Sequence, residues 1–150
     1  MKPKTVSELF RLYQTERKVK ITEEQFVTFA VFFPTILVII SDGVIDMEEW
    51  EYVKQLSRFM AKSFRDSENA EVDVNALTQA YLYEISFLLK FQRDWQEAFM
   101  EALKSYVQEN PEVKSSILDT IHLFAEASEG TSDDELEKIQ FIKEELALDA

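Results

Sequence analysis

The chain has no cysteine and, in 150 residues, only two glycines and three prolines. The absence of cysteine excludes disulfides, thiol chemistry and zinc sites built on thiolates. The shortage of glycine and proline leaves few places to turn, which favours long helices joined by short connections. No stretch alternates between apolar and polar residues strongly enough to indicate a strand. We therefore predict an all-α protein.

Long apolar runs are also missing. The most apolar stretch, residues 26–40, is shorter than the roughly 18 residues expected of a membrane-spanning helix, and it contains Pro34. This stretch is typical of a buried helix in a soluble protein. Residues 1–10 lack the apolar centre of a secretion signal, so we expect a cytoplasmic location.

Positive charge is scarce beyond the first twenty residues. The chain has a formal net charge of −13; residues 1–20 hold six Lys/Arg against two Glu (+4), and the rest holds ten Lys/Arg against 27 Asp/Glu (−17). An acidic body repels phosphate backbones, so we expect no binding to nucleic acid. The basic start has one apolar stripe, and we expect it to dock on the acidic body rather than on an acidic membrane. The stripe consists of Val6, Leu9, Phe10 and Tyr13.

Core-forming residues are plentiful, at 46% hydrophobic and 13% aromatic, and the length suits one domain. We predict a single-domain bundle of about seven helices, built from two related helix-loop-helix halves. Its parts are a basic N-terminal helix (1–20), a first half (22–65), central helices (74–109) and a second half (111–147), with an acidic connection at 66–73.

Most predicted helices have a recognisable start. Thr22 with Gln25 forms a capping box, and Asp73 caps a central helix. Asp94 with Glu97 indicates the start of a further helix after Phe91. Another helix follows Asn110, with Pro111 at its first position.

The two glycines, Gly43 and Gly130, lie in two similar segments, residues 41–49 and 128–135. Each segment follows an apolar helix, turns at an acid-glycine pair and opens a new helix with a capping pair, Asp46 with Glu49 and Ser132 with Glu135. Aligning the segments matches Trp50 to Leu136, Val53 to Ile139 and Leu56 to Ile142. This match indicates an internal repeat with one buried helix face present twice.

Acidic residues in the two loops fall into two groups. Asp46, Glu49 and Glu135 are explained as caps of the helices that follow. Asp42, Glu126 and Glu129 instead lie at or just beyond helix C-termini, where the helix dipole disfavours an anion by about 0.3–1 kcal/mol. A bound cation would reverse that penalty.

Oxygen ligands from both loops suit calcium or magnesium. The first loop supplies Asp42, Asp46 and Glu48 or Glu49, and the second supplies Glu129, Asp133 and Asp134. Neither loop is an EF-hand, because the third, sixth and twelfth positions counted from Asp42 are Val44, Met47 and Val53. The alternative is that these are hydrated surface acids.

A helix ending in Ser-Asp-Gly-Val-Ile, followed by Asp-Met-Glu-Glu and a helix with Trp50, Val53 and Leu56, resembles the TerB-like domains. That family comprises tellurite-resistance accessory proteins, with relatives at the N-terminus of a membrane-anchored DnaJ-type co-chaperone. The resemblance extends over residues 22–146 and implies an all-helical domain of two related halves with no known enzymatic activity, a divalent-cation site at the loop acids, and a role in stress response or partner binding. The metal ligands it implies are Asp42, Asp46, Glu49, Glu129, Asp133 and Glu135.

Two functions of different classes follow. The first is a TerB-like stress accessory protein in which a divalent cation, calcium or magnesium, bridges the two loops. The second is an ion-free interaction module or homo-oligomeric adaptor, which recognises a protein partner or a second copy through the acidic surface or the basic first helix. No set of residues forms a recognisable catalytic group, so we expect no enzyme and no cofactor beyond the cation.

Two further features have structural interpretations. His122, the only histidine, lies beside Leu118 in an apolar helix, and we expect it to be partly buried there. The aromatic series Phe87, Phe91, Trp95 and Phe99 has i, i+4 spacing, which favours core packing over a ligand pocket or a dimer face.

Overall fold

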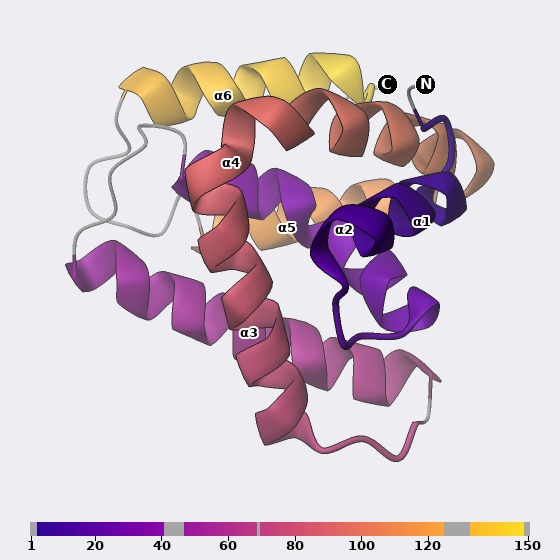
Figure 1. Cartoon of the computed structure of the whole chain (residues 1–150). Helices are drawn as coiled ribbons and strands as arrows, with labels where there is room; N and C mark the ends of the chain where they lie inside the picture. The colour runs from indigo at the N-terminus through magenta and orange to yellow at the C-terminus, as the bar shows by residue number, and fades with distance from the viewer. Residues whose placement is uncertain (1–2, 41–46, 69, 125–132, 149–150) are drawn as a thin grey trace.

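The computed structural model of the protein describes residues 3–40, 47–68, 70–124 and 133–148. Within these ranges the chain forms six α-helices and no strand (Figure 1). They are α1 (Val6–Arg17), α2 (Glu23–Ile39), α3 (Met47–Glu68), α4 (Val74–Glu109), α5 (Val113–Phe124) and α6 (Asp133–Glu145). The predicted all-α bundle is confirmed, with six helices in the described ranges where about seven were expected.

The basic first helix, α1, belongs to the body of the protein. Thr5 caps it by accepting a hydrogen bond from the Glu8 N–H at 3.1 Å. Val6, Leu9 and Tyr13 from the predicted stripe are buried, and α1 packs against α2 and α4. The predicted docking on the chain's own body is therefore confirmed.

Helix α2 is the central element, because it contacts all five other helices. Its capping box is present: Thr22 Oγ1 accepts from the Gln25 N–H at 3.2 Å, and Gln25 Oε1 accepts from the Thr22 N–H at 2.9 Å. All residues from Phe32 to the end of the helix are buried, Pro34 among them. The apolar stretch is thus a buried helix, as predicted.

Helix α4 is the longest helix and makes its most extensive packing with α3, which it crosses in Figure 1. Asp73 caps it as predicted, since its Oδ1 accepts from the Ala76 N–H at 3.1 Å. Helix α3 continues to Glu68, three residues beyond the predicted end of the first half at Arg65. The acidic connection is correspondingly shorter than expected.

The prediction of two central helices is confirmed in part, because α4 consists of two helical segments that meet at a kink near the expected break. Only Phe91 departs from helical geometry, with φ −118° and ψ 27°, so the break is a kink. Asp94 makes no hydrogen bond within the described part of the chain, and its spacing to Glu97 only imitates a cap. Burial of Leu88 and Trp95 on either side of the kink holds both segments against the same core.

Phe99 of α4 is the centre of an aromatic core. Its ring stacks on Phe33 of α2 with 4.4 Å between centroids and meets Tyr13 of α1 edge-on at 5.7 Å. Three more rings surround it, those of Phe26, Phe29 and Trp95. One side chain therefore joins α1, α2 and α4.

The aromatic series on α4 divides at the kink. Trp95 and Phe99 are buried, as core packing predicts, and Phe87 is half-buried. Phe91 is 44% exposed, so the prediction of core packing is wrong for this residue. The departure from helical geometry occurs at this residue.

Helices α5 and α6 close the bundle by packing against α2. Helix α5 begins at Val113, two residues after Pro111. His122 is exposed on it, contrary to the expected partial burial, because the buried face runs through Ile117, Ile121 and Phe124, and His122 lies one step off that face.

The expected repeat of one buried face is only partly seen. Val53 and Leu56 of α3 are buried, as are Ile139 and Ile142 of α6. Trp50 is half-buried, and its counterpart Leu136 is 53% exposed, which the repeat did not predict. The duplication itself stays a prediction.

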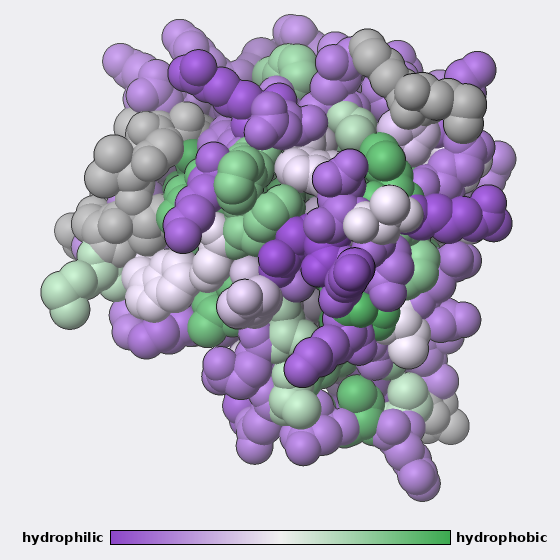
Figure 2. All heavy atoms as spheres, in the orientation of Figure 1, coloured by the Kyte–Doolittle hydropathy of each residue, from purple (hydrophilic) through white to green (hydrophobic). Residues whose placement is uncertain are grey.

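Among the described helices, none combines the length and apolar character needed to cross a membrane. The face drawn in Figure 2 is largely hydrophilic, with hydrophobic patches set between the polar side chains. Exposed large apolar residues in the described ranges include Phe59, Leu123 and Leu136.

Candidate functional site

Three of the six predicted metal ligands, Asp42, Asp46 and Glu129, lie outside the described residues. The other three open helices: Glu49 lies in the first turn of α3, and Asp133 and Glu135 in that of α6. Both helices begin at the left of the view in Figure 1. Within residues 3–40, 47–68, 70–124 and 133–148, no group of three acidic or histidine side chains is placed to hold a metal ion. The two-loop cation site therefore stays a prediction.

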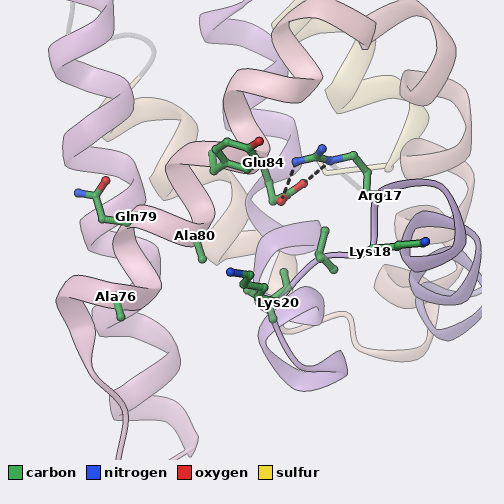
Figure 3. Close-up of a pocket in the computed structure, with 10 residues that line it drawn as sticks. Arg17, Lys18, Lys20, Ala76, Gln79, Ala80 and Glu84 are labelled. Carbon is green, nitrogen blue, oxygen red and sulfur yellow. Dashed lines mark hydrogen bonds and ion pairs between the residues drawn. The ribbon is translucent and has the colours of Figure 1, made fainter.

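A buried polar cluster joins α1 to α4 (Figure 3). Arg17 donates from Nε and Nη2 to the two carboxylate oxygens of Glu84, each at 3.0 Å. The Tyr13 hydroxyl donates to Glu84 Oε1 at 2.7 Å. Glu84 is only 5% exposed, and a buried carboxylate needs partners for its charge. The planar guanidinium of Arg17 supplies a bidentate one, and the Tyr13 hydroxyl adds a neutral donor. We call these three residues the clasp.

Burial raises the pKa of the Tyr13 phenol, and the nearby negative charge of Glu84 raises it further. The phenol therefore keeps its proton and acts as a permanent donor to Glu84. Tyr81 is similar: burial raises its pKa, and its hydroxyl donates to the Gln25 carbonyl of α2 at 2.7 Å. Both tyrosines act as structural donors between helices.

A cleft of about 600 Å³ lies beside the clasp, between α4 and the connection from α1 to α2. Its α4 side carries the small side chains of Ala76 and Ala80, which leave the space open. In Figure 3, Lys20 extends toward this side, whereas Lys18 points away from it. Arg17 is already paired with Glu84, so Lys20 is the one cationic side chain seen to extend into the cleft. A single lysine does not define a binding site, and we assign the cleft no ligand.

A second hollow, of about 580 Å³, is lined by four helices, and we call it the acidic groove. Three helices each present one stripe of residues at helical spacing. Its apolar and hydroxyl lining consists of Val27, Thr28, Val31 and Phe32 from α2, Phe59, Ser63 and Ser67 from α3, Tyr106 from α4, and Val113, Ser116 and Thr120 from α5.

Phe59 is the most prominent apolar side chain in the acidic groove. It is 40% exposed, although its ring packs edge-on against Phe32 at 5.8 Å and Phe124 at 5.4 Å. It also lines a smaller neighbouring hollow of about 370 Å³, together with Leu123 of α5. Phe59 is therefore held in place by two rings while part of its surface stays open to a ligand.

Charge in the acidic groove has one sign. Glu24 of α2, Glu68 of α3 and Asp119 of α5 line it and are exposed. No lysine or arginine is among the described residues that line it. Three carboxylates on three helices, on a chain of net charge −13, produce a negative field that attracts cationic partners.

The acidic groove presents groups suited to binding a partner. Its lining offers apolar contact, hydroxyl groups and carboxylates, and the one histidine of the sequence is not part of it. Sequence reasoning missed the groove because its lining comes from four separate stretches of chain. Phe59 was the available signal: it is a large apolar residue outside the buried stripe of Val53, Leu56, Met60 and Phe64.

Sequence reasoning also missed the clasp. Glu84 was its signal, since it is a charged residue within the apolar arc formed by Tyr81, Ile85 and Leu88 on α4. A carboxylate in such an arc needs a partner, which the sequence alone does not name.

Comparison of the chain with protein-family models, with curated proteins and with solved structures gives no match. Its own fold and surfaces are therefore the basis on which a function is proposed.

Proposed function

We propose that the chain is a non-enzymatic interaction module whose acidic groove holds a basic, amphipathic helix of a protein partner. The observation that carries this proposal is the pairing of a partly exposed, rigidly held Phe59 with the unopposed carboxylates of Glu24, Glu68 and Asp119. Apolar side chains of the partner would cover Phe59. Lysines or arginines flanking them would meet the carboxylates.

The dimensions of the acidic groove suit a short helical segment. Its α2 stripe runs from Glu24 to Phe32, which is about 12 Å at 1.5 Å per residue, or roughly two helical turns. Two turns present two or three apolar anchors at i, i+3 or i+4 spacing, as in helix-in-groove recognition. Such a contact is small, so we expect a transient interaction rather than an obligate one.

The charge of the acidic groove should raise the association rate of a basic partner and select against acidic ones. Exposed carboxylates steer a cationic segment toward the groove and repel acidic ones. Because exposed charges are screened over about 8 Å at physiological salt, the affinity should fall as salt is raised. The apolar part of the affinity, centred on Phe59, should persist.

A designed peptide tests the proposal. A fluorescein-labelled 14-residue helix with leucines on one face and lysines on the other is titrated with the intact protein, and its anisotropy is followed. Phe59→Ala should weaken binding about tenfold, which corresponds to 1.4 kcal/mol. An analogue in which glutamates replace the lysines should not bind. Equal binding of both peptides, or an unchanged affinity in Phe59→Ala, contradicts the proposal.

A matched pair of charge reversals separates the acidic groove from general attraction to an acidic protein. Glu24→Lys and Glu137→Lys change the net charge equally, but Glu137 lies on α6 and does not line the groove. Glu24→Lys should weaken peptide binding several-fold, and Glu137→Lys should change it little. Equal losses in the two variants would assign the binding to net charge alone.

We also propose a second function, which rests on the resemblance to TerB-like domains: a stress accessory protein that binds calcium or magnesium at the two acidic loops. The helices after the loops begin at Met47 and Asp133, which supports the predicted position of the acids at loop-helix junctions. The ligands proposed are those given by the resemblance, with Asp42 first among them. Stability measured with and without the ion tests this function independently of the groove.

A further inference from the structure

A third hollow, of about 440 Å³, lies where α4 kinks beside α1. It is lined by the aromatic rings of Phe87, Phe91 and Trp95, by Leu12 and Ala98, and by the carboxylates of Glu16 and Asp94. We call it the aromatic pocket. No described residue is shared between its lining and that of the acidic groove, so the two are separate sites.

The rings of the aromatic pocket form one connected group. The Phe87 ring lies 4.9 Å from that of Phe91 and 6.4 Å from that of Trp95, between centroids. Phe91 is 44% exposed at the kink, whereas Trp95 is 9% exposed and fixed edge-on against Tyr13 at 5.0 Å. The pocket thus combines an accessible ring with two rings that the core holds in position.

Phe87 already has a cation over its ring. The guanidinium carbon of Arg17 lies 4.2 Å from the Phe87 centroid while Arg17 is paired with Glu84. The negative face of an aromatic ring attracts a cation within about 6 Å of its centroid. The Phe91 ring has the same chemistry and is open to a ligand, and the largely buried Trp95 lines the pocket beside it.

The two carboxylates of the aromatic pocket add a negative field. Glu16 and Asp94 make no hydrogen bond or ion pair with any described residue, and no lysine or arginine lines the pocket in the described ranges. Asp94 has no capping role, because α4 is continuous there. An apolar, aromatic wall beside two uncompensated carboxylates suits a cation that is large and weakly hydrated.

We propose that the aromatic pocket binds an alkylated ammonium group, with its methyl groups against Phe91 and Trp95 and its charge facing Glu16 and Asp94. Quaternary ammonium ions match this lining because they offer apolar surface and positive charge together, without hydrogen-bond donors that would need partners. Such a group occurs in free choline-type molecules and in methylated lysine of proteins, and the two sources are distinguished by experiment.

The test uses the full chain and tetramethylammonium chloride as the first probe. Its methyl proton resonance should broaden and shift upfield in the presence of the protein, through contact with aromatic rings. Neopentyl alcohol, an uncharged molecule of similar shape, is the control at matched ionic strength. The ammonium ion should bind at least about fivefold more tightly; equal binding of the neutral molecule overturns the proposal.

Variants locate the site. Phe91→Leu keeps apolar bulk at an exposed position and removes the ring face, and it should weaken tetramethylammonium binding about fivefold without change in the circular dichroism. Asp94→Asn should weaken it several-fold and reduce its dependence on salt. Phe59→Ala, in the acidic groove, should leave it unchanged. Binding that survives Phe91→Leu, or is lost equally in Phe59→Ala, overturns the proposal.

Choline and a peptide with one trimethyllysine, each compared with its unmethylated counterpart, separate the two sources. Tighter binding of the methylated peptide assigns the pocket to a modified protein tail, and tighter binding of choline assigns it to a free small molecule. If neither methylated ligand binds better than its unmethylated counterpart, the proposal is wrong.

Discussion

Arg17 and Glu84 are joined by two hydrogen bonds of 3.0 Å across 67 positions of sequence. This pair anchors α1 to α4, and the Tyr13 hydroxyl completes it at 2.7 Å. The basic first helix, which by charge could have served as a free recognition element, is thereby fixed within the bundle. The acidic groove, which we propose as the partner-binding surface, has no described residue of α1 in its lining.

Breaking the clasp should be costly. Glu84→Ala removes the acceptor of three hydrogen bonds, two from Arg17 and one from Tyr13, and removing one partner of a buried ion pair costs about 3–5 kcal/mol. Replacing Arg17 and Glu84 together by methionine should cost less than the sum of the single changes, because no unpaired charge remains. Urea unfolding followed by circular dichroism measures both. Additive losses would show that the two residues are not coupled.

High pH should destabilise the fold through its buried tyrosines. The folded-state pKa of Tyr13 and of Tyr81 is raised, so above pH about 10 the unfolded chain loses these protons while the folded chain keeps them. Stability is therefore fully present below pH 10 and falls above it by about 1.4 kcal/mol per pH unit for each tyrosine. Tyr13→Phe should remove the contribution of one tyrosine, about 1.4 kcal/mol per pH unit, from the slope of unfolding free energy against pH above pH about 10. An identical slope in parent and variant would contradict this assignment.

The first helix should be required for folding. Leu9 is fully buried against the core, and Leu9→Ala should cost about 2–5 kcal/mol by opening a cavity. Deleting residues 1–20 removes Val6, Leu9 and Tyr13 together and should abolish cooperative thermal unfolding. Exposed Leu12→Ala is the matched control, with a loss expected below about 1 kcal/mol. A folded deletion variant would show that α1 is dispensable.

The cation proposal predicts ion-dependent stability. Calcium or magnesium at about 100 times its dissociation constant should add roughly 2.7 kcal/mol, provided that the unfolded chain does not bind it. Asp42→Ala should remove the shift in melting temperature, and the groove variant Phe59→Ala should keep it. Melting curves that superimpose with calcium, magnesium and chelator would end this proposal.

Local signals in the sequence predicted much of the fold. The capping box of Thr22 and Gln25 depends only on two residues three apart in sequence, so it could be predicted without knowledge of the tertiary packing. Asp94 and Glu97 gave the same signal, but the departure from helical geometry lies three residues earlier, at Phe91, and α4 is kinked there rather than ended. His122 was misplaced by a single step around its helix.

The surfaces were much less predictable than the helices. The acidic groove brings together Val31, Phe59 and Thr120 from three helices. The spacing of residues within one helix does not predict which helices are neighbours. Arg17, the partner of Glu84, lies 67 positions away in sequence. The sequence therefore showed a carboxylate within an apolar helix face but did not identify its partner. The i, i+4 spacing of the aromatic series predicted core packing for all four rings, on the assumption of an unbroken helix. Phe91 departs from helical geometry and is exposed, so the prediction is wrong for this residue.

We propose the acidic groove as the partner-binding surface, and its location can be measured in solution. The most direct measurement is a backbone amide chemical-shift map of the isotope-labelled protein, titrated with the lysine-leucine peptide. The largest shifts should cluster at groove residues and should fall away in Phe59→Ala; these residues are Val27, Val31, Phe59, Ser63 and Ser116. Shifts spread evenly over the acidic surface, or centred on another face of the bundle, would contradict it.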